Sequence, residues 1–433
     1  MKVLLLSIGT RGDMEPFLAV AESLRARGHE VACAFPEQFR STCDAIGLPF
    51  YGLSPRLLEL LASEDGLIVM GGKASPLRRI AAFVRLGRQG FSINAEMAVE
   101  QRTIVSSFAP DLIVHHPKAV FPILYSTQHP GKAVLLSPVP CIHHPVPGYP
   151  HVGMYNWFGK LFPAVTYWIA RQGLLQNILR SDKEYLSAHQ ITRAAIKAQL
   201  DRHPALYGLS PAVFPAPTSW PEHVHMVGFQ ERNQQQHWEP SESLKGFMDR
   251  HERVLLLSFG SMSNPEPERI TGLFMEALQK LGIPAIINCA WGGLQKSAQY
   301  DEGQFCFVEG IPYDWAFPRV YAVIHHGGAG TTQTALKYGC AAMIIPHIID
   351  QFLWNDINHA LGAGPKGQSI RQLKAARLQQ DIYDLWHNPG YRQSAKVVAQ
   401  KMAQEDAEAT CYDQLVQLSK ATQTKSPARG QDN

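Results

Sequence analysis

Residues 1–35 read MKVLLLSIGTRGDMEPFLAVAESLRARGHEVACAF. The apolar run Val3–Ile8 predicts a buried strand, and the Gly9–Asp13 segment that follows it predicts a turn. An amphipathic stretch over Pro16–Arg27 predicts a helix, after which a second apolar strand begins at Glu30. Strand, turn, helix and strand within about 30 residues form a βαβ unit, which predicts a parallel sheet.

The same order of elements returns in the second half of the chain. Arg253–Ser261 is an apolar run that ends in a Gly/Ser turn, and a helix is expected over 268–281. Further short buried strands are predicted at Leu112–Val114, Ala133–Leu136, Ala285–Cys289, Phe305–Val308, Ala322–Ile324 and Ala342–Ile345. Two such series predict an α/β protein with two doubly wound, Rossmann-like domains and a deep cleft where the carboxyl ends of their strands face each other.

The length of 433 residues also predicts two domains rather than one core. A proline-rich and then polar stretch marks their boundary. We expect an N-terminal domain over 1–222, a linker over 223–252, a C-terminal domain over 253–419 and a disordered polar tail over 420–433.

Composition excludes several classes of protein. The net charge of +3 is small and no basic block accompanies it, which argues against a nucleic-acid binder. The seven cysteines include no CxxC pair, which predicts reduced thiols of a cytoplasmic protein rather than a disulfide framework or a zinc site. No membrane-spanning helix is expected, whereas peripheral membrane contact and the oligomeric state stay open.

The segment HHGGAGTT, residues 325–332, suits an anionic ligand. It follows an apolar strand and precedes a helix, so the free N–H groups and the dipole at that helix start favour a phosphate. His326 and the hydroxyls of Thr331 and Thr332 can donate to a diphosphate. The alternative is a tight strand–helix turn without a ligand, because glycine-rich turns alone are weak evidence.

The wider sequence around this segment resembles the family 1 glycosyltransferases. The similar motifs are PYDWAFP (312–318), HHGGAGTT, PHIIDQFLWN (346–355) and LGAGP (361–365), and in the N-terminal half GTRGDMEP (9–16) resembles a GxRGDxxP turn. The most similar branch contains sterol glucosyltransferases and bacterial antibiotic or lipid glycosyltransferases. The resemblance implies the GT-B fold, with an N-terminal acceptor-binding domain and a C-terminal domain that binds a nucleotide sugar.

The resemblance also implies the donor site. A UDP-sugar would serve as co-substrate, with no resident cofactor and no metal, and Asp350 and Gln351 would suit a glucose-like hexose. Gly310–Tyr313 replaces the Trp-x-x-Gln that contacts uracil in plant members, and Thr334 replaces their ribose-binding glutamate, so thymidine stays an alternative to uridine. The donor-binding residues expected on this basis are Thr10, Arg11, Gly12, Ser261, Tyr313, His326, Gly328, Gly330, Thr331, Thr332, Asp350 and Gln351.

Asp13 is the expected catalytic base. An inverting transfer needs one group that removes the acceptor hydroxyl proton, and Asp13 lies on a strand–helix turn that faces the expected cleft. Relatives in the antibiotic and sterol branch have an aspartate at this position. The alternative interpretation is that Asp13 only caps the helix that follows. A second polar group could assist this weak base, but the sequence does not identify it.

Two histidine pairs follow strands of the N-terminal half and are expected in the acceptor site: His115, His116, His143 and His144. Adjacent histidines point in different directions, so neither pair is expected to bind a metal. The aromatic-rich stretch 151–180 either lines an apolar acceptor pocket or meets a membrane, or it packs as an ordinary helix.

These expectations combine into one function. The chain is expected to be an inverting, metal-independent glycosyltransferase that moves a hexose from a UDP-sugar to a hydroxyl of a hydrophobic acceptor, which could be sterol-, carotenoid-, polyketide- or glycolipid-like. The alternatives are a nucleotide-sugar epimerase and a non-catalytic nucleotide-sugar-binding protein of the same fold. Because the two half-sites lie on different domains, the cleft is expected to close when the donor binds.

Overall fold

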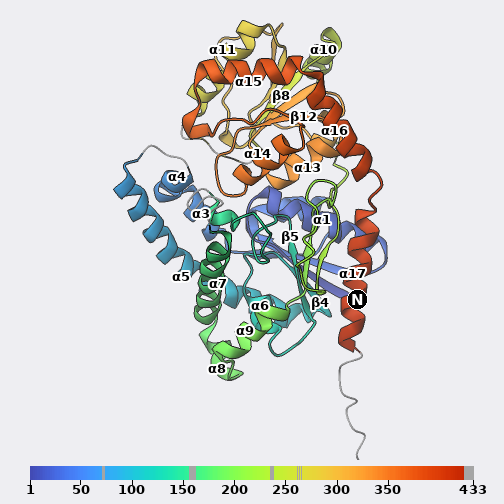
Figure 1. The fold of residues 1–433 in the computed structure, drawn as a ribbon. Coiled ribbons are helices and arrows are strands. Elements are labelled where there is room, and N and C mark those ends of the chain that lie inside the picture. The colour runs from blue at the N-terminus through green and yellow to red at the C-terminus, as the bar shows by residue number, and fades with distance from the viewer. Residues whose placement is uncertain are drawn as a thin grey trace, which may run out of the picture.

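The computed structural model describes residues 1–70, 74–155, 162–234, 238–260, 262, 264 and 266–423. This part of the chain forms two α/β domains, one above the other (Figure 1). Each domain is built on a sheet in which every neighbouring pair of strands is parallel. The expected fold class of two doubly wound, Rossmann-like domains is therefore confirmed.

The N-terminal sheet has the strand order β3-β2-β1-β4-β5-β6-β7. Its strands are β1 Lys2–Leu6, β2 Glu30–Pro36, β3 Phe50–Leu53, β4 Leu112–His115, β5 Ala133–Ser137, β6 Ala205–Tyr207 and β7 Val224–Met226. The helices of this half are α1 Arg11–Ala26, α2 Arg40–Ala45, α3 Arg56–Ala62, α4 Glu64–Met70, α5 Pro76–Phe108, α6 Phe121–Tyr125, α7 Pro163–Ser181, α8 Lys183–Ala188 and α9 Arg193–Arg202. Apolar side chains on both faces of the sheet are buried by these helices, as a parallel sheet requires.

The C-terminal sheet has the strand order β10-β9-β8-β11-β12. Its strands are β8 Leu255–Ser258, β9 Ala285–Asn288, β10 Phe305–Val308, β11 Ala322–His325 and β12 Ala341–Ile344. The helices that follow the N-terminal sheet are α10 Glu242–Arg250, α11 Pro267–Leu281, α12 Tyr313–Ala316, α13 Ala329–Lys337, α14 Gln351–Ala360, α15 Ala375–His387, α16 Pro389–Met402 and α17 Ala407–Gln423.

The helix after β1 begins earlier than its sequence suggests. It was expected from Pro16, because proline favours the first turn of a helix, but α1 begins at Arg11 and Pro16 lies inside it. The carboxylate of Asp13 accepts a hydrogen bond of 2.7 Å from the backbone N–H of Thr10, which satisfies a free donor at the helix start. Asp13 therefore stabilises the helix start, and this contact does not remove it from the cavity described below.

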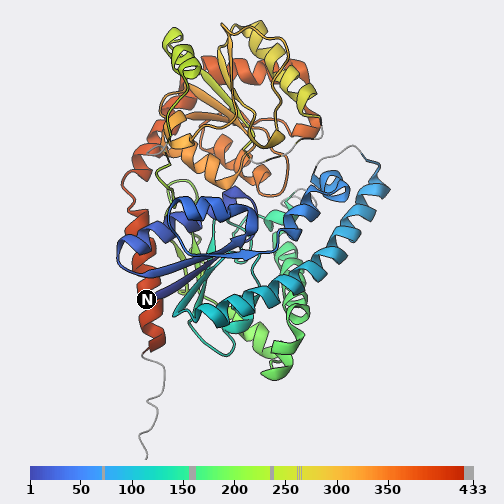
Figure 2. The ribbon, with the colours of Figure 1, turned by 180° about the vertical axis from the view of Figure 1, so that it is seen from behind.

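The domain boundaries differ from the expected ones in two places. Strand β7 belongs to the N-terminal sheet although it falls within the expected linker 223–252, because its residues pair with β6. Helix α17 returns to the N-terminal domain instead of ending the C-terminal domain at residue 419, because Cys411 and Leu415 are buried in the core around β1 and α1 (Figures 1 and 2). It extends to Gln423 and so includes the start of the expected tail, of which residues 424–433 lie outside the described residues.

No helix among the described residues is both long enough and apolar enough to cross a lipid bilayer.

Candidate functional site

A cavity of about 1370 Å³ lies between the two domains and is lined by residues of both. Its position follows from the topology. In each sheet the strand order reverses at the first strand, between β1 and β4 and between β8 and β11, and ligands of parallel sheets bind at such points. The first turn of α1 after β1 supplies Asp13, the loop after β4 supplies Lys118, and the loops after β8 and β11 supply Gly260 and His326. The two reversal points thus contribute to one cavity.

The carboxylate of Asp13 is held by two basic side chains from the loop after β4. The Nε2 atom of His116 lies 3.0 Å from Oδ1, and the Nζ atom of Lys118 lies 3.2 Å from both carboxylate oxygens. Burial raises the pKa of Asp13, but the charge of Lys118 and the contact with His116 oppose burial and together hold that pKa well below its usual range. Asp13 is therefore ionised at neutral pH.

His116 is the neutral partner in this group. Burial lowers the pKa of His116, although Asp13 partly opposes that effect. Its Nδ1 atom accepts a hydrogen bond of 3.3 Å from the backbone N–H of Lys118, so the ring proton of the neutral imidazole belongs on Nε2. That proton points at Asp13, and His116 thus fixes the orientation of the carboxylate as a hydrogen-bond donor.

Across the cavity, His326 lies between two glycines that leave room for its ring. A Cβ atom at Gly328 would lie 2.5 Å from the His326 Nε2 atom, and one at Gly260 would lie 2.9 Å from Cε1. Burial lowers the pKa of His326 well below its usual range, so the free protein holds this imidazole neutral. Among the described residues, the buried Nδ1 atom has no hydrogen-bond partner, although the ring lines the cavity.

Helix α13 begins directly after this histidine, and its N-terminal residues border the cavity. Gly328, Gly330 and Thr331 line the cavity, where free N–H groups of the first turn favour an anion. Thr332 does not line it: its side chain is fully buried and its hydroxyl donates 2.9 Å back to the carbonyl of Gly328. The helix turns the Thr332 hydroxyl toward its own backbone, so the structure places Thr331, and not Thr332, at the cavity, and a phosphate contact from Thr332 stays a prediction.

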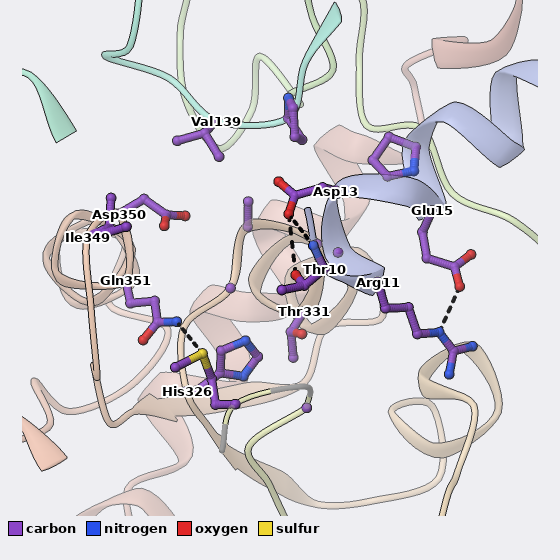
Figure 3. Close-up of a pocket in the computed structure, with 18 of the residues that line it drawn as sticks. Thr10, Arg11, Asp13, Glu15, Val139, His326, Thr331, Ile349, Asp350 and Gln351 are labelled. Atoms are coloured by element: carbon purple, nitrogen blue, oxygen red, sulfur yellow. Dashed lines mark hydrogen bonds and ion pairs between the residues drawn. The ribbon is translucent and has the colours of Figure 1, made fainter. Parts of the chain in front are cut away.

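Asp350 and Gln351 begin helix α14 on the wall that faces Asp13 (Figure 3). Burial, and to a lesser extent the nearby charge of Asp13, raise the pKa of Asp350 to about 6, and its Oδ2 atom accepts a hydrogen bond of 3.1 Å from the indole of Trp354. The Oε1 atom of Gln351 accepts from the backbone N–H groups of His347 (2.7 Å) and Ile348 (3.1 Å). The side-chain carbonyl of Gln351 thus holds the loop before α14, and the carboxylate of Asp350 lies close enough to feel the charge of Asp13.

The loop before α14 is held in an unusual backbone conformation. Ile349 has a φ of 45°, which β-branched residues rarely adopt, and its side chain is 53% exposed at the cavity wall. Such backbone strain persists only where surrounding contacts hold it. The side chain of Gln351, at the start of the next helix, supplies two such contacts, to the backbone N–H groups of His347 and Ile348.

The remaining donor-side residues are distributed as follows. Thr10, Arg11 and Gly12 line the cavity from the N-terminal domain, and the guanidinium of Arg11 pairs with Glu15 at 2.8 Å. Tyr313 also lines it and its hydroxyl lies 2.8 Å from Ser258 Oγ. Ser261 lies outside the described residues.

The four histidines expected in the acceptor site do not line the cavity. His115 is fully buried, with its Nε2 atom 2.7 Å from that of His203, and His144 Nδ1 lies 2.9 Å from the hydroxyl of Tyr207. His143 is half-buried, and the loss of solvent around it lowers its pKa to about 3. Of the first pair only His116 contacts Asp13. An acceptor-binding role of the four histidines stays a prediction.

Apolar side chains instead form the N-terminal part of the cavity wall. They come from the segment after β2, from α3, α4 and α7, and from loops after β4 and β5: Phe39, Leu57, Leu58, Ala62, Ile68, Val120, Val139, Val152 and Leu174. No sequence motif identifies these residues, because they are single apolar side chains on separate helices and loops. Lys118 was missed as well, although it follows the His115–His116 pair by only two residues.

The linker, which the sequence analysis treated as a spacer, also enters the cavity. Glu231, Arg232 and Gln234 line it. Arg232 pairs with Glu15 and Glu22 of α1, at 3.2 and 3.0 Å, so the linker is tied to the N-terminal domain beside the site. Within the aromatic stretch, Tyr155 lines the cavity and its hydroxyl donates 2.6 Å to Asp356 of the C-terminal domain, whereas Trp157 and Phe158 lie outside the described residues.

Two family models match the chain, one in each domain. The glycosyltransferase family 28 N-terminal domain matches residues 3–114, and the erythromycin biosynthesis protein CIII-like C-terminal domain matches residues 303–418. Two sterol 3-beta-glucosyltransferases of Arabidopsis thaliana are 28% and 29% identical to the chain over 94% and 95% of its length. A sterol 3-beta-glucosyltransferase of Kluyveromyces lactis is 24% identical over 98% of the chain.

These relatives are longer proteins. The chain spans 64% and 67% of the two plant sequences and 35% of the yeast sequence. Solved structures share the fold over nearly the whole chain. The glycosyltransferase SnogD from Streptomyces nogalater has a TM-score of 0.67 at 20% identity and covers 97% of this chain and 99% of its own. The calicheamicin glycosyltransferase CalG4 has a TM-score of 0.67 at 17% identity, with the same coverage.

The order of the two matched domains, the relatives that align from end to end of the chain, and the shared two-domain architecture agree with the motifs around Asp13 and His326. The chain belongs to the family 1 glycosyltransferases of GT-B fold.

Proposed function

We propose that the protein is an inverting glycosyltransferase that transfers a glucose-like hexose from a UDP-sugar to the hydroxyl of a sterol-like acceptor without a metal ion. One observation carries this proposal. A single cavity joins the ionised carboxylate of Asp13, the N-terminus of α13 with His326, and an apolar wall from α3, α4 and α7. A base, an anion site and a hydrophobic acceptor site are the three parts that such a transfer requires.

The donor diphosphate would lie at the start of α13. Free N–H groups around Gly330 and the hydroxyl of Thr331 would donate to it, and the unpartnered Nδ1 atom of His326 would face it. The hexose would then extend toward Asp350, whose carboxylate accepts from sugar hydroxyls. These groups stabilise the charge that develops on the leaving UDP, which is the work a metal ion does in other transferases.

Asp13 would accept the proton of the acceptor. The acceptor oxygen attacks the anomeric carbon from the face opposite UDP, the new C–O bond forms as the bond to the phosphate oxygen breaks, and the hydroxyl proton passes to Asp13. An ion-paired carboxylate is a weak base, but the oxygen becomes strongly acidic once it bonds to carbon, so a weak base suffices late in the step. His116 and Lys118 would keep that carboxylate ionised and pointed at the acceptor.

The apolar wall supports a hydrophobic acceptor. Leu57, Leu58, Ile68 and Leu174 present aliphatic side chains that match a rigid hydrocarbon better than a sugar or a nucleotide. The relatives named as sterol 3-beta-glucosyltransferases point to the same class, so sterols come first, followed by carotenoid-, polyketide- and glycolipid-like hydroxyls.

The two alternatives make different demands on the same cavity. An epimerase would need no apolar wall for a second substrate, and a non-catalytic binding protein would need no held carboxylate opposite the diphosphate site. The wall and the Asp13 group both favour transfer over these alternatives.

The test is UDP release by the purified protein in the presence of EDTA. UDP-glucose is offered with each of four acceptors, namely a sterol, a carotenoid, a macrolide and a flavonoid, and TDP-glucose is offered in parallel. The proposal expects release that depends on the acceptor, is greatest with the sterol and survives EDTA. Conversion of the UDP-sugar without any acceptor would favour the epimerase, and donor binding without turnover on any acceptor would favour the non-catalytic protein.

A further inference from the structure

Glu231 is a carboxylate of the linker that the proposed transfer does not use. Its side chain lines the cavity and is only 13% exposed. The ammonium of Lys337 lies 2.7 Å from its Oε2 atom, and the hydroxyl of Tyr338 donates to the same atom at 3.4 Å. Both partners belong to the end of helix α13, so the C-terminal domain holds this linker carboxylate at the cavity.

The surroundings of Glu231 favour a ligand that donates hydrogen bonds. Burial raises the pKa of this carboxyl, while the charge of Lys337 and the contact with it oppose that effect. A carboxylate removed from water needs other donors in place of the water it has lost. Lys337 supplies part of this compensation, and hydroxyl groups of a bound ligand would add to it.

The residues after Glu231 fix its backbone beside the cavity. The guanidinium of Arg232 lies 3.2 Å from Glu15 of α1. The backbone N–H of Gln234 donates 2.8 Å to the Oδ2 atom of Asp314 in α12. These contacts attach the linker to both domains and occupy two neighbouring carboxylates of the cavity. Glu231 is thus a positioned acceptor rather than a mobile side chain of a spacer.

The distance of Glu231 from the start of α13 indicates which part of a donor it would meet. Its carboxylate contacts Thr334, which also lines the cavity. The hydroxyl of Thr334 donates 2.9 Å to the carbonyl of Gly330, one helical turn earlier. One turn corresponds to about 5.4 Å along the helix. A diphosphate at Gly330 and Thr331 would therefore place the pentose attached to it near Glu231.

The other direction along the cavity belongs to the hexose. Figure 3 shows Asp350 on one side of Thr331 and Glu15 on the other. Glu15 pairs with Arg232, the residue after Glu231, so the linker enters on the side away from Asp350. A diphosphate at Thr331 that directs its hexose toward Asp350 directs its nucleoside toward Glu231.

A ribose offers this carboxylate two donors, the adjacent 2′- and 3′-hydroxyls, and an ionised carboxylate only accepts. Acidic side chains accept from the ribose 2′-hydroxyl in other nucleotide sites of parallel α/β sheets. We propose that Glu231 accepts hydrogen bonds from the ribose hydroxyls of the donor and so selects uridine over 2′-deoxynucleotides such as thymidine diphosphate. This role rests on the proposed function, because it requires a nucleotide at the start of α13.

The test is calorimetry of the full chain with UDP and with 2′-deoxy-UDP, which differ only in the 2′-hydroxyl. The wild type should bind UDP about 10–150-fold more tightly, the range for one hydrogen bond to a charged group. Glu231→Met has a similar length and no acceptor, and it should bind the two nucleotides within about threefold of each other. Glu231→Gln keeps a neutral acceptor, so its preference should lie between those of the wild type and E231M.

The matched control is Glu22→Gln. Glu22 also contacts the linker, through Arg232 at 3.0 Å, but it is not among the residues that line the cavity. This variant should keep the wild-type preference for UDP, and thermal unfolding should show that each variant is folded.

Two results would overturn the role of Glu231 while leaving the donor site intact. One is equal binding of UDP and 2′-deoxy-UDP by the wild type, and the other is a wild-type preference in either Glu231 variant. Binding of neither nucleotide by the wild type would instead refute the donor site of the proposed function, and the role of Glu231 with it.

Discussion

Gly328 offers a test of whether the imidazole of His326 occupies the donor site as described. Its backbone angles, φ −61° and ψ 145°, are accessible to any residue, so an alanine there meets no backbone strain. The new Cβ atom would instead lie 2.5 Å from His326 Nε2 and 3.2 Å from Cε1. Gly260 borders the same ring near its Cε1 atom.

The expected magnitude follows from this contact. Gly328→Ala should destabilise the protein by about 1–3 kcal/mol, the usual cost of inserting one carbon into a packed site. In a His326→Ala background the ring is gone, and the same substitution should cost less than about 0.5 kcal/mol. If the displaced ring no longer reaches the diphosphate, UDP binding should weaken by about 10–150-fold, which corresponds to one charge-assisted hydrogen bond.

The assay is a double-mutant cycle on four proteins: the wild type, G328A, H326A and G328A/H326A. Thermal unfolding ranks their stabilities, and calorimetry with UDP gives the dissociation constants. The reasoning predicts that G328A lowers the melting temperature in the wild-type background only. It is refuted if G328A costs the same in both backgrounds, or if G328A binds UDP as tightly as the wild type does.

Three further predictions concern titratable groups of the cavity. Lys118→Met removes a charge that lowers the pKa of Asp13, so the acidic limb of the kcat/KM profile should move to higher pH; an unmoved limb would contradict the role of Lys118. His326 is neutral in the free protein, and a bound diphosphate favours its charged form, so UDP binding should take up a proton and should become tighter as pH falls. Calorimetry in two buffers of different ionisation enthalpy would detect this proton uptake, and His326→Ala should abolish it. Because the pKa of Asp350 is raised to about 6, its stabilising contribution is present below its unfolded pKa of 3.8 and lost as pH rises through 6. Asp350→Asn should therefore flatten that part of the melting-temperature profile, and an unchanged profile would contradict the raised pKa.

Much of the fold could be predicted from the sequence, since short apolar runs that end in glycine turns specify strands of a buried parallel sheet. The strand Leu112–Val114 was expected within one residue of β4. The destination of α17 could not be predicted, because an amphipathic helix shows which face is apolar and not which domain that face will meet. The same limit applies to β7, whose partner strand is separated from it by a proline-rich segment.

The site residues that belong to one short sequence motif could be predicted. Asp13, His326 and Asp350 each follow a strand end and line one cavity. The partners of Asp13 were not predictable, because His116 and Lys118 lie in the loop after β4, about a hundred residues further along the chain, and only the parallel pairing of β1 with β4 brings them to Asp13. The apolar wall has no motif at all, because it consists of single residues from several helices.

The most direct test of the account is the rate of acceptor-dependent UDP release by Asp13→Asn, measured beside its affinity for UDP. Asparagine has nearly the same shape as aspartate and keeps an oxygen that can accept from the N–H of Thr10, but it cannot take a proton from the acceptor. The account predicts that kcat falls by about 10²–10⁴-fold while UDP binding changes by less than about twofold. A kcat within about threefold of the wild-type value would contradict the assignment of Asp13 as the base.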